Sequence, residues 1–259
     1  MDNPERTTAV EPIPRPGTGS ARWDLASHLR LWPAAAAGLA LDLWSKHWAF
    51  SRLDPGEGIV IVPHLLRFQR SLNTGALFGL GKGWTLLFIG ASVLALVFVL
   101  SLFVNSNRDR RSLHVALALV LAGAVGNLYD RAFQIADVVT YTTKGQTRTI
   151  VGKVTRQDER FWSVDTWPEQ SPWQKIPVAW NPALRQQGVV RDFVKMEPRI
   201  RIGGWTIQVW PWVFNVADVL LVVGVGILLL NFWWDRSAHR AGREPSHSSR
   251  SVERACGSG

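Results

Sequence analysis

The sequence predicts an all-α membrane protein in which four transmembrane helices form a bundle. Of its 259 residues, 47% are hydrophobic and 19% are charged, and this average alone would also fit a soluble domain. The apolar residues are gathered into four blocks, however, and the charged residues lie in the tails and connections. The chain also contains 14 Trp, a residue enriched at membrane interfaces. This clustering argues against a single water-soluble core.

The first two predicted spans differ in strength. Residues 31–50 form the weaker one, because Asp42 and Lys46 interrupt the apolar run. Residues 84–104 carry no charge, and at about 1.5 Å per residue a segment of this length crosses a hydrocarbon layer of about 30 Å. The second span is therefore the best defined of the four.

The last two predicted spans are residues 113–131 and 212–234. The third contains the segment LALVLAGAVG, which offers no polar face to water. The fourth is as long as the second and contains one acid near its start, Asp218. Both are better interpreted as membrane spans than as soluble helices.

The short basic connection between the second and third spans predicts the orientation. Arg108, Arg110 and Arg111 lie in it, and short loops rich in Lys and Arg face the cytoplasm. Both tails, residues 1–30 and 236–259, are then cytoplasmic, and the long segment 132–208 lies outside. Topology also accounts for the net charge of +9, and because no nucleic-acid-binding motif is present we expect no nucleic acid partner.

Polar residues within the spans converge on one depth, toward the outer leaflet. Ionisable groups inside a bilayer cost about 2.5–3.5 kcal/mol or more near its centre, so they indicate function. Residues three or four positions apart share a helix face, which places Asp42 with Lys46, Asn215 with Asp218, and Asn127 with Asp130. Hydrogen bonding between spans is the plain alternative, but three patches at a matching depth favour an intramembrane site.

Carboxylates are the groups left to carry chemistry there. The chain has one cysteine, Cys256, and contains no phosphate-binding loop, nucleophile elbow or metal-ligand spacing, so we expect no metal and no cofactor. Two carboxylates that share a proton can activate water as a general base and protonate a leaving amine as a general acid.

Four motifs, in order along the chain, resemble those of lipoprotein signal peptidase, also called signal peptidase II. They are LDLWSK at 41–46, SLNTGALFGL at 71–80, GAVGNLYDR at 123–131 and WPWVFNVADVLLVVG at 210–224. The resemblance implies an aspartic endopeptidase of the bacterial inner membrane that removes signal peptides from diacylglyceryl-modified prolipoproteins, before the lipidated cysteine. It also implies a small extracytoplasmic β cradle on the four-helix bundle, to which residues 59–72 contribute.

The resemblance assigns one catalytic aspartate to Asp218 of FNVAD and the other to a segment of the type GxVxDF. It implies that further motif positions orient the pair or hold substrate: Asp42, Lys46, Asn73, Gly75, Asn127, Asp130, Arg131 and Asn215. For Asp42 and Lys46, a salt bridge that anchors the first helix is an equal alternative. For Gly75 a tight turn is favoured over direct contact.

The sequence departs from the family between GNLYDR and the segment GVVRDFV. An insertion at about 135–187 intervenes, rich in Thr, Lys, Arg, Gln and Trp, and the alternation in TRTIVGKVT is typical of a β-hairpin. We expect an extracytoplasmic loop that is dispensable for the chemistry. The insertion leaves two candidates for the second aspartate, and we favour Asp192, in GVVRDFV, over Asp137, which follows Asp130 more closely.

Two other function classes remain open from the residues alone. Intramembrane acids also mark proton- or ion-coupled transporters, and the chain could instead be a non-enzymatic anchor that presents a Trp-rich extracytoplasmic loop. Neither explains acids at one depth as well as a peptidase does. We expect a monomer that contacts membrane lipids.

Overall fold

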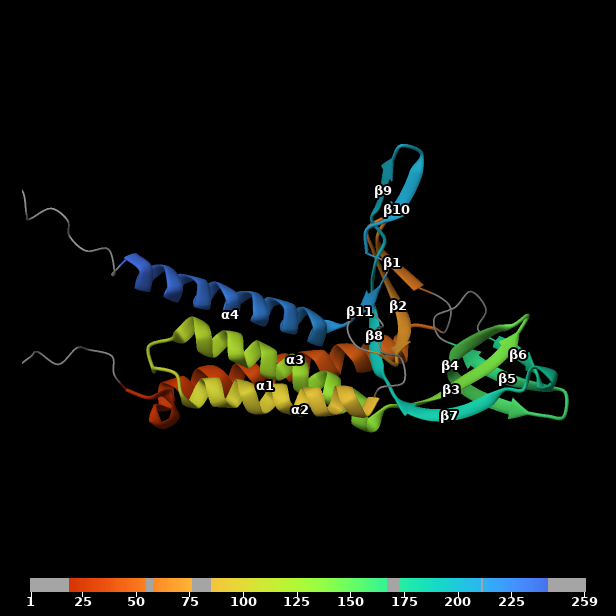
Figure 1. Cartoon of the computed structure of the whole chain (residues 1–259), viewed down its shortest axis with the longest axis horizontal. Coiled ribbons are helices and arrows are strands. Elements are labelled where there is room, and N and C mark those ends of the chain that lie inside the picture. Colours follow the sequence, from red (N-terminus) through yellow and green to blue (C-terminus); the bar gives the residue numbers. More distant parts are fainter. Residues whose placement is uncertain (1–18, 55–57, 76–84, 167–172, 211, 242–259) are drawn as a thin grey trace, which may run out of the picture.

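Four helices and three antiparallel sheets make up the computed structural model, which describes residues 19–54, 58–75, 85–166, 173–210 and 212–241. The helices α1 (Leu25–Arg52), α2 (Thr85–Val104), α3 (Arg111–Phe133) and α4 (Val216–Ala241) form an elongated bundle. The start of α1 and the end of α4 lie at one end of the bundle, and the sheets lie at the other (Figure 1).

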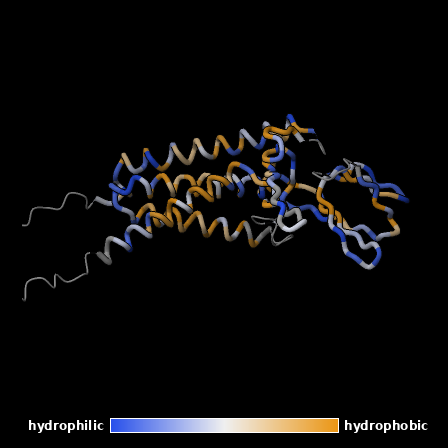
Figure 2. The backbone as a smooth tube through the Cα atoms, turned by 90° about the horizontal axis from the view of Figure 1, so that it is seen from above, coloured by the Kyte–Doolittle hydropathy of each residue, from blue (hydrophilic) through white to orange (hydrophobic). Residues whose placement is uncertain are grey.

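Helices α1 and α3 extend beyond both ends of the apolar blocks that predict them. Helix α2 matches its block to within one residue, and α4 begins four residues late but extends past the end of its block. α1 begins six residues before the expected span, at Leu25 instead of residue 31, because Asp24 caps it: its carboxylate accepts a 2.8 Å hydrogen bond from the backbone N–H of Ser27. Hydrogen bonds from the Ser27 side chain and backbone also lower the pKa of Asp24. Within the described residues, α3 and the stretch 216–237 of α4 are long and apolar enough to cross a membrane, and Figure 2 shows mostly hydrophobic residues along the bundle.

Helix α3 packs against the other three helices, and small residues allow close approach. A Cβ on Gly123 would collide with the carbonyl oxygen of Ala217 in α4, and one on Gly38 in α1 would press on Ala122. Glycine and alanine at such positions let helix backbones come together inside a membrane. The bundle core consists largely of aliphatic side chains and one phenylalanine: Leu31, Val99, Phe103, Leu113, Leu117 and Leu121.

A four-stranded sheet, which we call the cradle, lies on the end of the bundle. Its strands run in the order β1 (Gly58–Val62), β2 (Leu66–Asn73), β8 (Val190–Met196) and β11 (Val213–Phe214). Phe193 of β8 packs against Ala49 and Leu53 at the end of α1. The hairpin of β9 (Arg199–Ile202) and β10 (Trp205–Gln208) projects sideways from the cradle (Figure 1). The cradle therefore joins the ends of α1 and α4.

The insertion folds as a five-stranded antiparallel sheet, not as a loop. Its strands run in the order β6 (Trp173–Pro177), β5 (Phe161–Thr166), β4 (Gln146–Gln157), β3 (Ile135–Thr143) and β7 (Ala183–Gly188). TRTIVGKVT lies within β4 alone, and the hairpin partner is β3 through a turn in which Lys144 and Gly145 both have positive φ. A small core stabilises the sheet: Val139, Tyr141, Ile150, Val164 and Ile176.

The expectation of an all-α fold is therefore wrong. The four helices are present, but they account for only part of the chain, and the cradle, the β9–β10 hairpin and the inserted sheet are all β-structure. Long apolar runs reveal helices, whereas most of these strands have nine residues or fewer and mix polar with apolar residues, so they add little to a hydropathy pattern.

Candidate active site

The segment FNVAD forms the N-terminal cap of α4. The backbone N–H of Asp218 donates to Asn215 Oδ1 at 3.0 Å, and the backbone N–H of Asn215 donates to Asp218 Oδ2 at 3.2 Å. These reciprocal bonds have the geometry of a capping box, with an acid three residues after the cap. The sequence that starts the helix thus also fixes the Asp218 carboxylate.

Asp192 lies on β8 and is held by two amides. Asn215 Nδ2 donates to its Oδ1 at 2.6 Å, and Asn73 Nδ2 donates to its Oδ2 at 3.0 Å. Asp192 is 1% exposed and Asn215 is fully buried. Asn215 therefore connects both carboxylates, one through its side chain and the other through its backbone.

The turn at 73–75 orients the Asn73 amide. The N–H of Gly75 donates to Asn73 Oδ1 at 2.9 Å, and the Gly75 carbonyl accepts from Arg131 Nη2 at 2.8 Å. Because the Asn73 oxygen is already occupied within the turn, its NH₂ group faces Asp192. Gly75 thus has the role of a turn residue that is tied to α3.

Burial raises the pKa of the Asp192 carboxyl well above its usual range, and the neighbouring carboxylate of Asp218 raises it further. The amides of Asn73 and Asn215 act in the opposite direction, because they favour the charged form. Two neighbouring carboxyl groups in such surroundings retain one proton more readily than they lose both.

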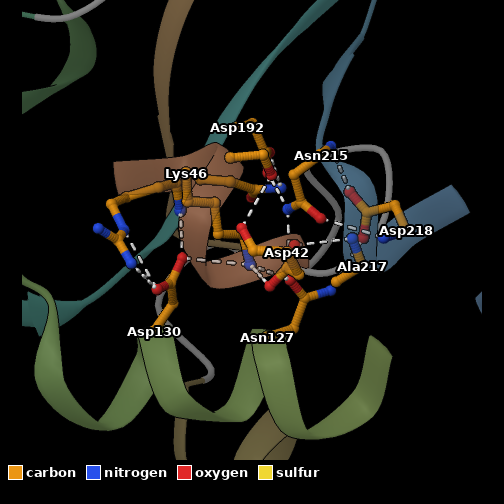
Figure 3. Close-up of polar contacts among 11 residues, drawn as sticks. Asp42, Lys46, Asn127, Asp130, Asp192, Asn215, Ala217 and Asp218 are labelled. Carbon is orange, nitrogen blue, oxygen red and sulfur yellow. Dashed lines mark hydrogen bonds and ion pairs between the residues drawn. The ribbon is translucent and has the colours of Figure 1, made fainter. Parts of the chain in front are cut away.

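A buried ion cluster lies beneath the two carboxylates. Lys46 Nζ is 2.8 Å from Asp42 Oδ2 and 3.4 Å from Asp130 Oδ2, and it donates to Asn127 Oδ1 at 3.1 Å. Asn127 in turn donates from Nδ2 to Asp218 Oδ1 at 2.9 Å. Figure 3 shows these side chains pointing toward one another from α1, α3, β8 and α4.

Asp42 also anchors the start of α4. Its Oδ1 accepts a 2.8 Å hydrogen bond from the backbone N–H of Ala217, one of the N–H groups that a helix start leaves without an intrahelical partner. A Cβ on Gly126 of α3 would collide with the Asp42 carboxylate. Glycine at this position therefore lets α3 approach α1 closely enough for Lys46 to reach Asp130 and Asn127 of α3.

Sequence reasoning missed two contributors, Arg191 and Gln187. Arg191 donates to Asp130 from its backbone N–H at 2.9 Å and from Nη2 at 2.7 Å. A buried acid such as Asp130 needs a partner of opposite charge, and this general requirement was the only sequence signal that could have pointed to Arg191. Gln187 donates from Nε2 to the carbonyl oxygen of Thr74 at 2.9 Å, and no motif pointed to it.

The structure places all the predicted site residues in one connected network at the junction of bundle and cradle. The alternative aspartate, Asp137, lies instead in the inserted sheet, where its carboxylate accepts from the backbone N–H of Val154 at 2.8 Å and from Gln186 at 3.4 Å. In the described part of the chain, no three His, Cys, Asp or Glu side chains group in a way that could hold a metal ion.

Asp218 lines two cavities. An apolar one of about 220 Å³ lies between the cradle and α4, lined by Trp212, Phe214, Val219, Val222 and others. A more polar one of about 260 Å³ lies toward α2 and α3, and its lining includes Asn73, Asn127, Arg131 and the small residues Ala91 and Ala95. Asp218 is thus accessible from an apolar side and from a polar side.

Known proteins resemble this chain in sequence and in fold. A lipoprotein signal peptidase of Rhodopirellula baltica is 29% identical over 86% of this chain and 79% of its own length. One of Clostridium novyi is 33% identical over 96 residues, and the chain spans only 65% of that protein's length. A solved structure described as a bacterial membrane enzyme, 19% identical, covers 85% of this chain and 94% of its own with a TM-score of 0.54, which shows a shared fold.

One family model covers most of the bundle and all of the cradle. The model described as signal peptidase (SPase) II matches residues 34–234, which include all four motifs and the inserted sheet. This match confirms the resemblance drawn from the motifs, and the chain belongs to the signal peptidase II family.

Proposed function

We propose that the protein is an aspartic endopeptidase that removes the signal peptide from diacylglyceryl-modified prolipoproteins, cutting before the lipidated cysteine. One observation carries the proposal: Asn215 holds two carboxylates, the buried one of Asp192 and the half-buried one of Asp218, at the end of a membrane-type helix bundle. Each belongs to a segment matching a motif of the family. The printed names of the relatives, lipoprotein signal peptidases, support the substrate class.

In this mechanism Asp192 and Asp218 share one proton. The ionised carboxyl takes a proton from a water molecule, which attacks the scissile carbonyl, and the protonated one gives its proton to the departing amine. Asn73 and Asn215 hold the Asp192 oxygens as acceptors, and Asn127 holds Asp218. The amides thereby fix the orientation of both carboxylates before substrate arrives.

The two cavities fit the two parts of such a substrate. The apolar cavity is suited to acyl chains of the lipidated cysteine, because valines of α4 form its wall next to Asp218. The polar cavity offers amides, a guanidinium and small side chains to the peptide near the cut. We further propose four membrane spans at the inner membrane, both tails in the cytoplasm, and the site near the outer leaflet.

The test uses the purified protein in detergent with a diacylglyceryl-modified prolipoprotein. Asp192→Asn and Asp218→Asn should each lower turnover by about 10²–10⁴-fold, the usual contribution of a positioned acid or base. Because the pair acts as a unit, the double variant should lose hardly more than either single one. Asp137→Asn is the matched control and should cleave normally.

Two outcomes would change the proposal. Near-normal cleavage by Asp192→Asn with an inactive Asp137→Asn would reverse the assignment of the dyad. If the folded wild-type protein releases no signal peptide, the peptidase proposal is wrong, and a transporter or a membrane anchor becomes the better interpretation.

A further inference from the structure

The base of the inserted sheet touches the catalytic turn. Gln187, near the end of β7, is 5% exposed, and its Nε2 donates to the carbonyl oxygen of Thr74 at 2.9 Å. Thr74 lies between Asn73, which binds Asp192, and Gly75, which closes the turn. Two hydrogen bonds therefore link the insertion to the site: one from Gln187 to Thr74, and one from the adjacent residue Asn73 to the Asp192 carboxylate.

The contact is rigidly placed. Gly188 follows Gln187, and a Cβ there would collide with the carbonyl oxygen of Arg131 at the end of α3. The N–H of Val189 donates to the carbonyl of Gln134 at 2.9 Å. The end of β7 thus packs tightly against the end of α3, just before β8, which contains Asp192. The backbone of Gln187 is therefore held in place while its side chain binds the turn.

Three different parts of the fold hold the turn at three successive residues. β8 holds the Asn73 side chain, the inserted sheet holds the Thr74 carbonyl, and α3 holds the Gly75 carbonyl through Arg131. A buried carbonyl that loses its donor pays for desolvation without compensation. The turn would then relax to find another partner, and the Asn73 amide would move with it.

We infer that Gln187 is a positioning residue for the peptidase reaction: it holds the Thr74 carbonyl and thereby aims the Asn73 amide at Asp192. The inference rests on the proposed function. It limits the part of the insertion that we expect to be dispensable to the outer strands β4, β5 and β6, which do not take part in this contact. The base of the inserted sheet at Gln187 does take part in it.

Gln187→Met keeps the length and apolar stem of the side chain and removes the donor. It should lower kcat about three- to tenfold, the effect of one hydrogen bond, with KM changed less than twofold. Gln187→Glu has the same shape but places an acceptor against the carbonyl, so its loss should be larger. The matched control is Gln186→Met, since the neighbouring Gln186 is exposed and, among the described residues, its side chain hydrogen-bonds to Asp137 of the inserted sheet.

The pH profile separates positioning from mere support of the sheet. The charged groups that act on Asp192 are Asp218 on α4, Lys46 on α1 and Arg131 on α3, and none of them is changed. A weakened Asn73 bond favours the protonated form of Asp192, so the alkaline limb of kcat should move to higher pH in both Gln187 variants. It should stay in place in Gln186→Met.

An infrared titration of the Asp192 carboxyl, taken as the difference from Asp192→Asn, gives a readout without turnover. The band of the protonated carboxyl should persist to higher pH in Gln187→Met than in wild type. An unchanged titration and unchanged kcat in folded Gln187 variants would overturn the inference, as would equal changes in Gln186→Met. Absence of cleavage by wild type, with the titration still shifted, would count against the proposed function alone.

Discussion

Replacing Lys46 with Met should destabilise the protein strongly. Lys46, Asp42 and Asp130 are all fully buried, and Arg191 completes a cluster of two cations and two carboxylates. The substitution keeps the size of the side chain but leaves one uncompensated negative charge. Removing one partner of a buried pair costs about 3–5 kcal/mol, which corresponds to a fall in melting temperature of roughly 6–20 °C for a domain of this size.

The measurement is thermal unfolding in detergent, followed by circular dichroism. The control is Arg156→Met, which removes an ion pair with Asp158 whose side chains are 75% and 41% exposed, and such pairs contribute about 0–1 kcal/mol. Adding Asp42→Asn to Lys46→Met restores neutrality, and the new amide oxygen can still accept from Ala217. The double variant should therefore be more stable than Lys46→Met. If Lys46→Met melts within about 3 °C of wild type, the four charged side chains do not act as one electrostatic unit.

Two further changes test the site's electrostatics and packing. Because burial and Asp218 raise the pKa of Asp192, the shared proton is retained as pH rises and cleavage should fall only above the raised pKa. Asn73→Ala removes a bond that favours the charged form, so it should lower kcat and move this alkaline limb upward, and a downward shift in a pH–rate profile would contradict that sign. Gly188→Ala places a methyl group against the Arg131 carbonyl; it should lower both cleavage and melting temperature, and wild-type values in both assays would show that β7 can shift freely.

The helices could be predicted from the sequence because a bilayer demands long apolar runs. The uncharged apolar run at residues 84–104 predicts α2, and the helix is observed at Thr85–Val104. The inserted sheet could not be predicted in the same way. Its strands alternate apolar residues with Thr, Lys and Arg, and its small core forms only when four of its five strands, β3, β4, β5 and β6, come together.

The site was predictable where chemistry and spacing coincide. Asn215 with Asp218, and Asp42 with Lys46, share a helix face by spacing alone, and the structure joins both pairs through Asn127. Gln187 had no such signal, because its partner is a backbone carbonyl 113 positions away in sequence. Contacts from a side chain to a remote backbone leave no pattern in the sequence of either segment.

The way in which the insertion joins the fold explains how the site tolerates it. The inserted sheet begins at Ile135 and ends at Gly188, and these two residues face each other in the β3–β7 pair. Gln134 and Val189, just outside, are joined by a 2.9 Å backbone hydrogen bond. The end of α3 and the start of β8 therefore meet as they would across a short connection, and strand pairing offsets the entropy of closing the longer loop. The end of α3 thus fixes where β8 begins, and with it the position of Asp192, although the inserted sheet lies between α3 and β8 in the sequence.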